Sequence, residues 1–223
     1  MTQIKELEKA LLTELSEHVG EYGFDTKVKG QSFYKQMPFG RLAFHLSFIK
    51  HKTDVDVTID LAVRFDELEE LVNEYENRLS KAQKKGTFSL GVELGNLSEG
   101  RQKRWTVANL EDVEPVAQSI MNSFVAIGLP YLDKYSDMQT ALEVLSGDGQ
   151  AAWLHSPSHD ARAKRALGLA FLLGDREQFS QLAAAKTDFL KSRNDFGLTL
   201  FVGFREALEN RLTSSSIRRN KAH

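Results

Sequence analysis

The chain has 223 residues, of which 41% are hydrophobic and 27% are charged, and this is the composition of a globular protein rather than of a disordered or fibrous one. The formal net charge is −2 and the isoelectric point is near 6.3, well below that of a typical nucleic-acid-binding protein. The chain has no cysteine, which excludes disulfides, thiolate nucleophiles and cysteine-ligated metal clusters. Because no long apolar run and no secretory signal is found, we expect a cytoplasmic protein that does not enter a membrane.

Alternating apolar residues predict a β-sheet in the first 145 residues. Residues 31–38 are expected to form a short strand that ends at Pro38. Three segments, at residues 42–49, 54–63 and 88–94, have the period of two that is typical of strands. Residues 101–107 are expected to form a polar loop that runs into another short strand. The connection at residues 50–54 is short enough for a hairpin, so we expect the second and third strands to pair antiparallel. In the third strand, valine, isoleucine and leucine alternate with three aspartates, which predicts one apolar face and one acidic face.

Apolar residues at helical spacing predict the other elements. The expected helices span residues 4–22, 66–79, 109–128, 137–145, 156–173, 175–190 and 196–212. Two glycines and a serine at residues 146–150 interrupt the pattern and predict a hinge or domain boundary. We therefore expect an α+β sheet domain over residues 1–146, a helical subdomain over residues 147–212 and a flexible tail over residues 213–223.

The predicted fold class is α+β. It consists of an antiparallel β-sheet with helices packed on one face, plus a C-terminal all-helical extension. The first three long helices, at residues 4–22, 66–79 and 109–128, are expected to cover the apolar face of the sheet.

A succession of short motifs runs through the first 145 residues. A helix is followed by Phe33-Tyr34, the strand Val57-Thr-Ile-Asp-Leu-Ala-Val63, a loop with Arg104-Trp-Thr-Val107, a second helix and Leu129-Pro-Tyr-Leu132. This order resembles a bacterial family known only as a domain of unknown function. Asp60 and Ala62 stand where that family more often has Asn and Gly, and Arg104 stands where a second Trp is common. The resemblance implies an α+β fold. It also implies a binding role, because such domains often look like components of bacterial conflict or immunity loci.

The acidic face of the predicted sheet is the main candidate binding surface. The polar residues expected on it are Asp54, Asp56, Thr58, Asp60, Glu93 and His45. Carboxylates and imidazoles can bind a hard metal ion or act as general acids and bases. Asp56 and Asp60, however, are four positions apart on one strand, which is about 13–14 Å and too far for both to bind one ion. The pattern therefore favours docking of a basic protein partner. The alternative is a metal-dependent hydrolase or nuclease that uses Asp56, Glu93 and His45.

Two other groups of residues are weaker candidates. The first is the loop of Arg101, Lys103, Arg104 and Trp105, where basic side chains flank an aromatic ring that can stack on a nucleobase. The surrounding region is acidic, so packing of Trp105 at the sheet edge is favoured over nucleic-acid binding. The second is His155 with His159, but Pro157 between them predicts a helix start rather than a metal site.

Sequence motifs of the common enzyme classes are absent. The chain has no Gly-x-Ser-x-Gly, no Gly-x-x-x-x-Gly-Lys, no His-Glu-x-x-His and no strand followed by Gly-x-Gly-x-x-Gly. We therefore expect a non-enzymatic protein-binding module, such as an immunity or adaptor protein of a bacterial conflict system. It is expected to need no cofactor and no metal, and to have a protein partner rather than a membrane or a nucleic acid.

Overall fold

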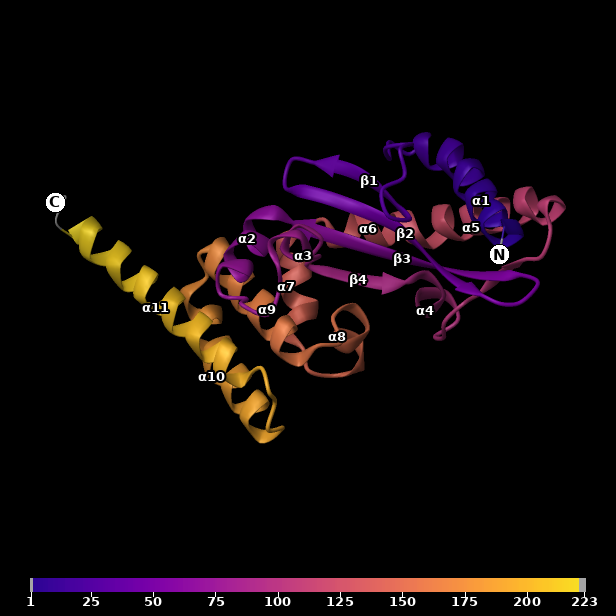
Figure 1. Cartoon of the computed structure of the whole chain (residues 1–223). Coiled ribbons are helices and arrows are strands. Elements are labelled where there is room, and N and C mark those ends of the chain that lie inside the picture. Colours follow the sequence, from indigo (N-terminus) through magenta and orange to yellow (C-terminus); the bar gives the residue numbers. More distant parts are fainter. Residues whose placement is uncertain (1, 221–223) are drawn as a thin grey trace. The chain divides into compact units, whose positions relative to one another are not determined.

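The chain folds into two compact units. The computed structural model describes the backbone of residues 2–220 and the side chains of residues 4–214. The first unit is Met1–Arg64 with Leu90–Ser136, and the second is Phe65–Ser89 with Asp137–His223. The predicted α+β class is confirmed, because the chain contains a five-stranded antiparallel sheet with helices and a helical C-terminal region (Figure 1). Within the described residues, no helix is long and apolar enough to cross a membrane.

The predicted strand segments form one sheet. Its strands are β1 Ser32–Met37, β2 Gly40–Lys50, β3 Val55–Phe65, β4 Leu90–Glu93 and β5 Trp105–Val107. The order is β1-β2-β3-β4, and β5 also pairs with β3. β4 pairs with the later part of β3, where Asp60 lies opposite Glu93, and β5 pairs with the earlier part, where Asp56 lies opposite Thr106. β3 therefore organises the sheet.

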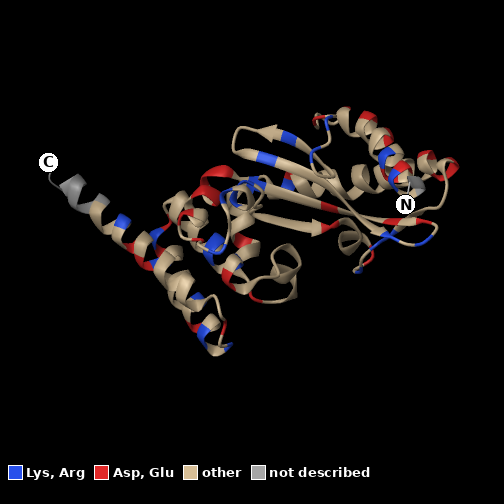
Figure 2. Cartoon of the chain, viewed as in Figure 1, with Lys and Arg blue, Asp and Glu red and all other residues tan. Residues whose placement is uncertain are grey.

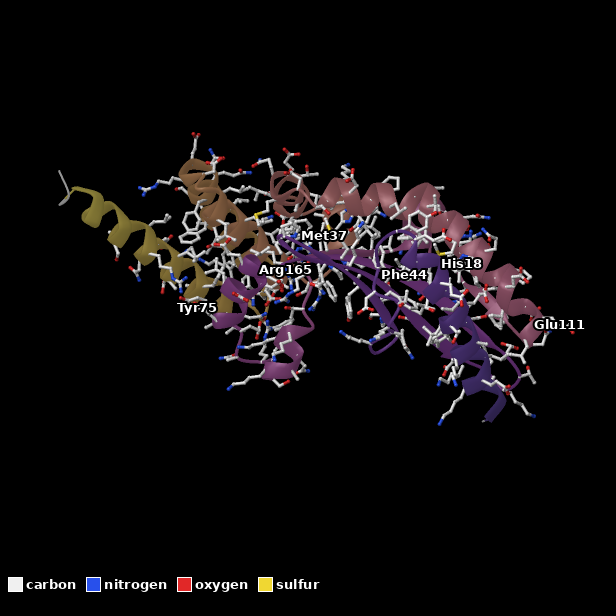
Figure 3. All side chains as sticks on the ribbon, turned by 90° about the horizontal axis from the view of Figure 1, so that it is seen from above. His18, Met37, Phe44, Tyr75, Glu111 and Arg165 are labelled. Carbon is white, nitrogen blue, oxygen red and sulfur yellow. The ribbon has the colours of Figure 1, made fainter. Side chains whose placement is uncertain are left out.

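The core of the first unit lies between the apolar face of this sheet and its helices. Its helices are α1 Thr2–Gly20, α4 Leu94–Ser98, α5 Val113–Ser123 and α6 Leu129–Tyr135, with a 3₁₀ turn η1 Leu110–Asp112 and a π-helical turn η2 Phe124–Gly128. α1 and α5 pack against each other. The ring of Phe124 packs edge-on against Phe44 of β2, with centroids 4.9 Å apart, and against Tyr22 and Phe24, which follow α1 (Figure 3 labels Phe44). Phe124 thus joins both helices to the sheet.

The helix that was expected to end at Gly128 continues beyond it. α5 passes through the π-helical turn η2 directly into α6, and Gly128 has the helical φ of −69°. A Cβ atom at this position would lie 2.6 Å from the Phe124 ring and 2.9 Å from Leu61 of β3. Gly128 is therefore required for close packing of the helix on the sheet, and it does not terminate the helix.

The second unit is built around one buried helix. Its helices are α2 Asp66–Glu74, α3 Lys81–Lys85, α7 Met138–Ser146, α8 Gln150–His155, α9 His159–Leu173, α10 Arg176–Ser192 and α11 Leu198–Asn220. α9 packs against α2, α7, α10 and α11. Nine residues of α9 are buried, including Asp160, Arg162 and Lys164.

These contacts divide the chain differently from the predicted segments 1–146 and 147–212. Residues 65–89 and 137–146 belong to the second unit, because α2 and α7 both pack on α9. α2, which covers the first part of the helix predicted over residues 66–79, is grouped with the C-terminal helices, and its expected place on the sheet stays a prediction.

The segment at residues 146–150, which was expected to be a hinge, is held in place by α9 and α10. Lys186 donates hydrogen bonds to the carbonyl oxygen of Ser146 at 2.6 Å and to Asp148 at 2.7 Å, and Arg162 donates to the carbonyl oxygen of Gly147 at 3.3 Å. Both basic side chains are almost completely buried. The segment therefore connects α7 to α8 as a fixed turn of the second unit.

The predicted tail at residues 213–223 has a helical backbone as far as Asn220, where α11 ends. No glycine or proline follows Gly203 to break this helix. The predicted flexibility of the tail stays a prediction. Residues 221–223 of the predicted tail lie outside the described residues.

We expect Gly128→Ala to lower the free energy of unfolding by about 1–3 kcal/mol, because the added methyl group overpacks the contact between Phe124 and Leu61. The matched control is Gly203→Ala in α11, where an added Cβ would meet no atom within 4 Å. That change should be neutral or raise stability by up to about 1 kcal/mol through helix propensity. Urea unfolding of both variants measures the difference. Equal stability of the two variants would contradict the close packing described at Gly128.

Candidate functional site

The outer face of the sheet carries most of the polar residues singled out by the sequence. The alternating apolar residues of β3 are completely buried, and the polar residues between them face the other way. On this face the structure separates the predicted site into two groups. We call His45, Asp60 and Glu93 the central cluster, and we call His51, Asp54 and Asp56 the hairpin cluster, since they lie at or beside the β2–β3 turn.

The central cluster is held by hydrogen bonds within the first unit. Asp60 accepts a hydrogen bond from the hydroxyl of Ser47 at 3.2 Å, and His45 Nδ1 lies 2.8 Å from the hydroxyl of Ser32. Burial raises the pKa of the Asp60 carboxyl, although the Ser47 hydroxyl and His45 oppose the rise. Asp60 is therefore harder to ionise than an ordinary aspartate.

Glu93 serves as the N-terminal cap of α4. Its carboxylate accepts hydrogen bonds from the backbone N–H groups of Gly95 at 3.0 Å, Asn96 at 3.1 Å and Lys103 at 3.3 Å. Burial raises its pKa, and the nearby charge of Asp60 adds to the rise, while the three backbone donors act against it. With three donors already bound, Glu93 has a clear structural role as a helix cap.

The hairpin cluster is more exposed to solvent than the central cluster. Its surroundings lower the pKa of Asp56, whereas those of the central cluster raise the pKa values of Asp60 and Glu93. Asp56 accepts hydrogen bonds from the Thr106 hydroxyl at 2.6 Å and lies 3.1 Å from His51 Nε2 and 3.8 Å from Arg104. The hydrogen bond from Thr106 is the largest influence on the pKa of Asp56, which is lowered despite partial burial. Asp56 is therefore firmly ionised at neutral pH.

The remaining residues predicted for this face differ in accessibility. Asp54 is partly exposed and accepts a hydrogen bond from the Thr53 hydroxyl at 3.1 Å. Thr58 is buried, at 2% exposure. The structure thus brings His45, Asp60 and Glu93 together on neighbouring strands, and it places Asp56 near His51 at the turn.

The hairpin cluster contains the ligand types that a divalent cation prefers. One ligand atom from each of His51, Asp54 and Asp56 can be chosen so that all three lie within 4.8 Å of one another. His51 was not among the predicted site residues, although its position in the turn beside two aspartates could have suggested it. In this arrangement the imidazole is already hydrogen-bonded to Asp56, and the guanidinium of Arg104 lies near the same carboxylate.

The predicted nucleic-acid residues are engaged in local contacts. Trp105 of β5 is only 6% exposed, and its indole N–H donates to the Ser119 hydroxyl at 3.1 Å. The Lys103 ammonium lies 5.0 Å from the centre of the indole ring. Arg101 pairs with Glu99 at 3.3 Å, and Arg104 approaches Asp56. Trp105 is therefore packed at the sheet edge, the arrangement that the sequence favoured, and its ring is not open to a nucleobase.

The two histidines separated by Pro157 belong to different helices. His155 lies in the last turn of α8, and His159 is the first residue of α9. The ring of His159 packs edge-on against Phe189, and its Nδ1 lies 2.9 Å from Arg162 Nη2. As the sequence predicted, a new helix begins in this segment.

The sequence did not predict a network of charges in the second unit, four of whose six members are buried. We call it the helical-unit ion network, and its members are Glu69, Glu76, Arg78, Asp160, Lys164 and Arg165. Figure 2 shows the acidic residues of α2 in red and the basic residues of α9 in blue. The pattern of α9 contained a signal, because Asp160 and Lys164 are spaced i, i+4 in a helix that is otherwise rich in alanine and leucine. A charged helix face is usually solvated, and the sequence does not show that this one is covered.

The network is tightly bonded. Arg78 forms two hydrogen bonds with the carboxylate of Glu76, at 2.9 and 2.7 Å, and another with Asp160 at 2.7 Å. Lys164 lies 2.9 Å from Glu76 and 3.5 Å from Asp160. Arg165 forms a two-pronged pair with Glu69, at 2.8 and 3.1 Å (Figure 3 labels Arg165). Three carboxylates and three basic groups thus compensate one another, with the Arg78 side chain, which is 39% exposed, on the solvent side of the network.

The surroundings hold the carboxylates of this network in the charged state. Hydrogen bonding from Arg78 is the largest influence on the pKa of Glu76, which lies far below its usual range. Burial pushes the pKa of Asp160 upward, but hydrogen bonds from Ser158 and Arg78 and the charge of Lys164 outweigh burial and lower it. These two groups therefore stabilise the folded state only while they are ionised.

Comparisons of this chain with protein-family models, with curated proteins and with solved structures found no match. The resemblance to a bacterial domain of unknown function remains a prediction from the residues that carry it.

We expect acid to open the second unit at a higher pH than the sheet of the first. The lowered pKa values of Glu76 and Asp160 contribute stability that is present above about pH 4, the ordinary carboxyl pKa, and is lost as the pH falls toward the lower folded values. The raised pKa values of Asp60 and Glu93 have the opposite effect, since these groups bind protons more readily when folded.

Hydrogen exchange followed by mass spectrometry measures this difference when rates are corrected for the intrinsic effect of pH. Peptides from residues 65–89 and 159–173 should lose protection before peptides from residues 40–63 as the pH is lowered. Earlier opening of the β2–β3 peptides would contradict the assignment.

Proposed function

We propose that this chain is a non-enzymatic protein-binding module that docks a basic protein partner through the hairpin cluster on the outer face of its sheet. The single observation that carries the proposal is the geometry of Asp56, whose ionised carboxylate is fixed by Thr106 and His51 beside the partly exposed Asp54. A side chain that is already held in place loses little conformational entropy on binding. A carboxylate held in a fixed orientation at the end of the sheet favours a partner with complementary positive charge.

The role we propose is that of an immunity or adaptor protein of a bacterial conflict system, acting in the cytoplasm. The motif resemblance and the absence of common catalytic motifs support this role. In the central cluster, Glu93 is occupied as a helix cap, and Asp60 is hydrogen-bonded to Ser47. This arrangement favours a binding surface over an acid–base pair.

We expect the double variant Asp54→Asn, Asp56→Asn to weaken partner binding by about tenfold or more, which corresponds to about 1.4 kcal/mol or more. The matched control is Glu114→Gln, which removes one negative charge from an exposed position on α5. Arg104→Gln should strengthen binding, because it removes the positive charge 3.8 Å from Asp56. The partner is first isolated from a native-like bacterial lysate at low and moderate salt, and its affinity for each variant is then measured by calorimetry.

Unchanged affinity of the double variant would overturn the proposed surface. The absence of any stoichiometric partner at either salt concentration would overturn the proposed function. A partner whose affinity falls equally with Glu114→Gln would indicate a general charge effect and would also count against the hairpin cluster.

The geometry of the hairpin cluster also favours one alternative, a metal-dependent hydrolase or nuclease. The three ligand atoms of His51, Asp54 and Asp56 support it, whereas the trio proposed from the sequence, Asp56, Glu93 and His45, is divided between the two clusters. If the protein-binding proposal is correct, titration with Mg²⁺, Mn²⁺ or Zn²⁺ should give no binding that the double variant abolishes. Binding of one ion that depends on both aspartates would favour the alternative.

A further inference from the structure

The second unit contains a small cavity beside the helical-unit ion network. It has a volume of about 190 Å³ and is formed by α2, the segment that follows it and α9. Its charged lining residues are Glu76, Arg78, Lys164 and Arg165. A water molecule occupies about 30 Å³ in the liquid, so the cavity can hold an ion of the size of phosphate together with some water.

The charge that faces this cavity is positive, although the network as a whole is balanced. Three of the four charged lining residues are basic. The other two carboxylates of the network, Glu69 and Asp160, bind Arg165, Arg78 and Lys164 but are not part of the lining. The carboxylates thus hold the basic groups in position, and the cavity retains an excess of positive lining charge.

The three basic residues retain hydrogen-bonding capacity. Arg165 uses Nε and Nη2 for Glu69, and Arg78 uses Nε and Nη2 for Glu76 and Asp160, so the Nη1 group of each makes no hydrogen bond to another described residue. Lys164 contacts two carboxylates and has three N–H donors. Arginine groups fixed in this way are suited to an oxyanion, because their planar donors match its oxygen atoms.

We infer that this cavity is a binding site for a small oxyanion of the phosphate class. The site lies in the second unit and is separate from the proposed docking surface, whose residues belong to the first unit. Lys164 is 1% exposed and pairs with the buried Glu76 and Asp160, so its ammonium group is in place before the anion arrives. The Arg78 side chain is 39% exposed and is held by hydrogen bonds to the same two carboxylates. The ligand can be inorganic phosphate or the phosphate group of a larger molecule, since both present the same oxygen atoms.

The test is calorimetric titration of the full chain with inorganic phosphate, compared with chloride at equal ionic strength. We expect phosphate to bind at one site, and we expect Ala161→Leu to weaken binding by at least about tenfold. Ala161 lines the cavity without contributing a charge, so the larger side chain fills space and leaves the ion pairs intact. The matched control is Ala184→Leu at an exposed position of α10, which should bind phosphate as the original chain does.

A second measurement keeps the inference testable if Ala161→Leu does not fold. In NMR spectra of the original chain, phosphate should shift the side-chain N–H signals of Arg78 and Arg165 more than those of Arg101 or Arg104. Titration with a phosphomonoester such as phosphoserine distinguishes the two kinds of ligand. Binding of phosphoserine would show that the cavity accepts a phosphate carried by a larger molecule. Binding of inorganic phosphate alone would show that the cavity excludes the rest of such a molecule.

Three results would overturn the inference. They are no phosphate effect beyond that of chloride, phosphate binding that Ala161→Leu leaves unchanged, and signal shifts spread evenly over the surface arginines. None of these outcomes depends on Asp54 or Asp56, so failure of the anion site is distinguishable from failure of the proposed docking surface.

Discussion

The arrangement of the first unit depends on the pairing of β3. This strand has β2 on one side and, on the other, β5 along its first residues and β4 along its later ones. Its alternating apolar residues are completely buried, so its polar residues must face outward. The register then decides which polar groups become neighbours across the strands. Asp60 lies opposite Glu93, and Asp56 lies opposite Thr106.

This register gives two aspartates of one strand opposite electrostatic properties. Asp60 is surrounded by few donors and is substantially removed from water, so its pKa rises. Asp56 lies near the turn, receives a short hydrogen bond from Thr106 and is close to Arg104, so its pKa falls. A face on which the sequence predicts several carboxylates is therefore divided into a central part, where the pKa values of Asp60 and Glu93 are raised, and an end, where Asp56 is ionised. This division directs the proposed docking surface to the hairpin cluster.

The second unit carries several charged residues on a buried helix. α9 is covered by four other helices, and the charged residues on it are removed from water. Such groups persist only when counter-charges and hydrogen bonds compensate for lost solvation. Glu76 and Arg78, which follow α2, and Glu69 on α2 provide that compensation for α9. The same pairing keeps the basic groups beside the cavity in fixed positions, which is the basis of the inferred oxyanion site.

The sequence by itself determined the secondary structure well, because helices and strands depend on local periodicity. Periodicity predicted the strands at residues 42–49, 54–63 and 88–94, the short connection at residues 50–54 predicted the hairpin, and Pro157 predicted the start of α9. The acidic surroundings of Trp105 favoured its packing at the sheet edge, where it is buried. A glycine in a helical pattern is an ambiguous signal, because it can mark the end of a helix or a close contact. The sequence predicted a helix end at Gly128, but in the structure this glycine permits close approach to Phe124 and Leu61.

Only the tertiary structure decided the grouping of the helices and the partners of the charges. The sequence places Glu69 and Arg165 nearly a hundred residues apart, and nothing local indicates that they form a pair. Likewise, the sequence does not show that α2 packs on α9. Periodicity shows that a residue lies on a face of an element, but what covers that face is set by contacts between distant segments. For this reason the hairpin cluster could be anticipated in part from the sequence, whereas the helical-unit ion network and its cavity could not.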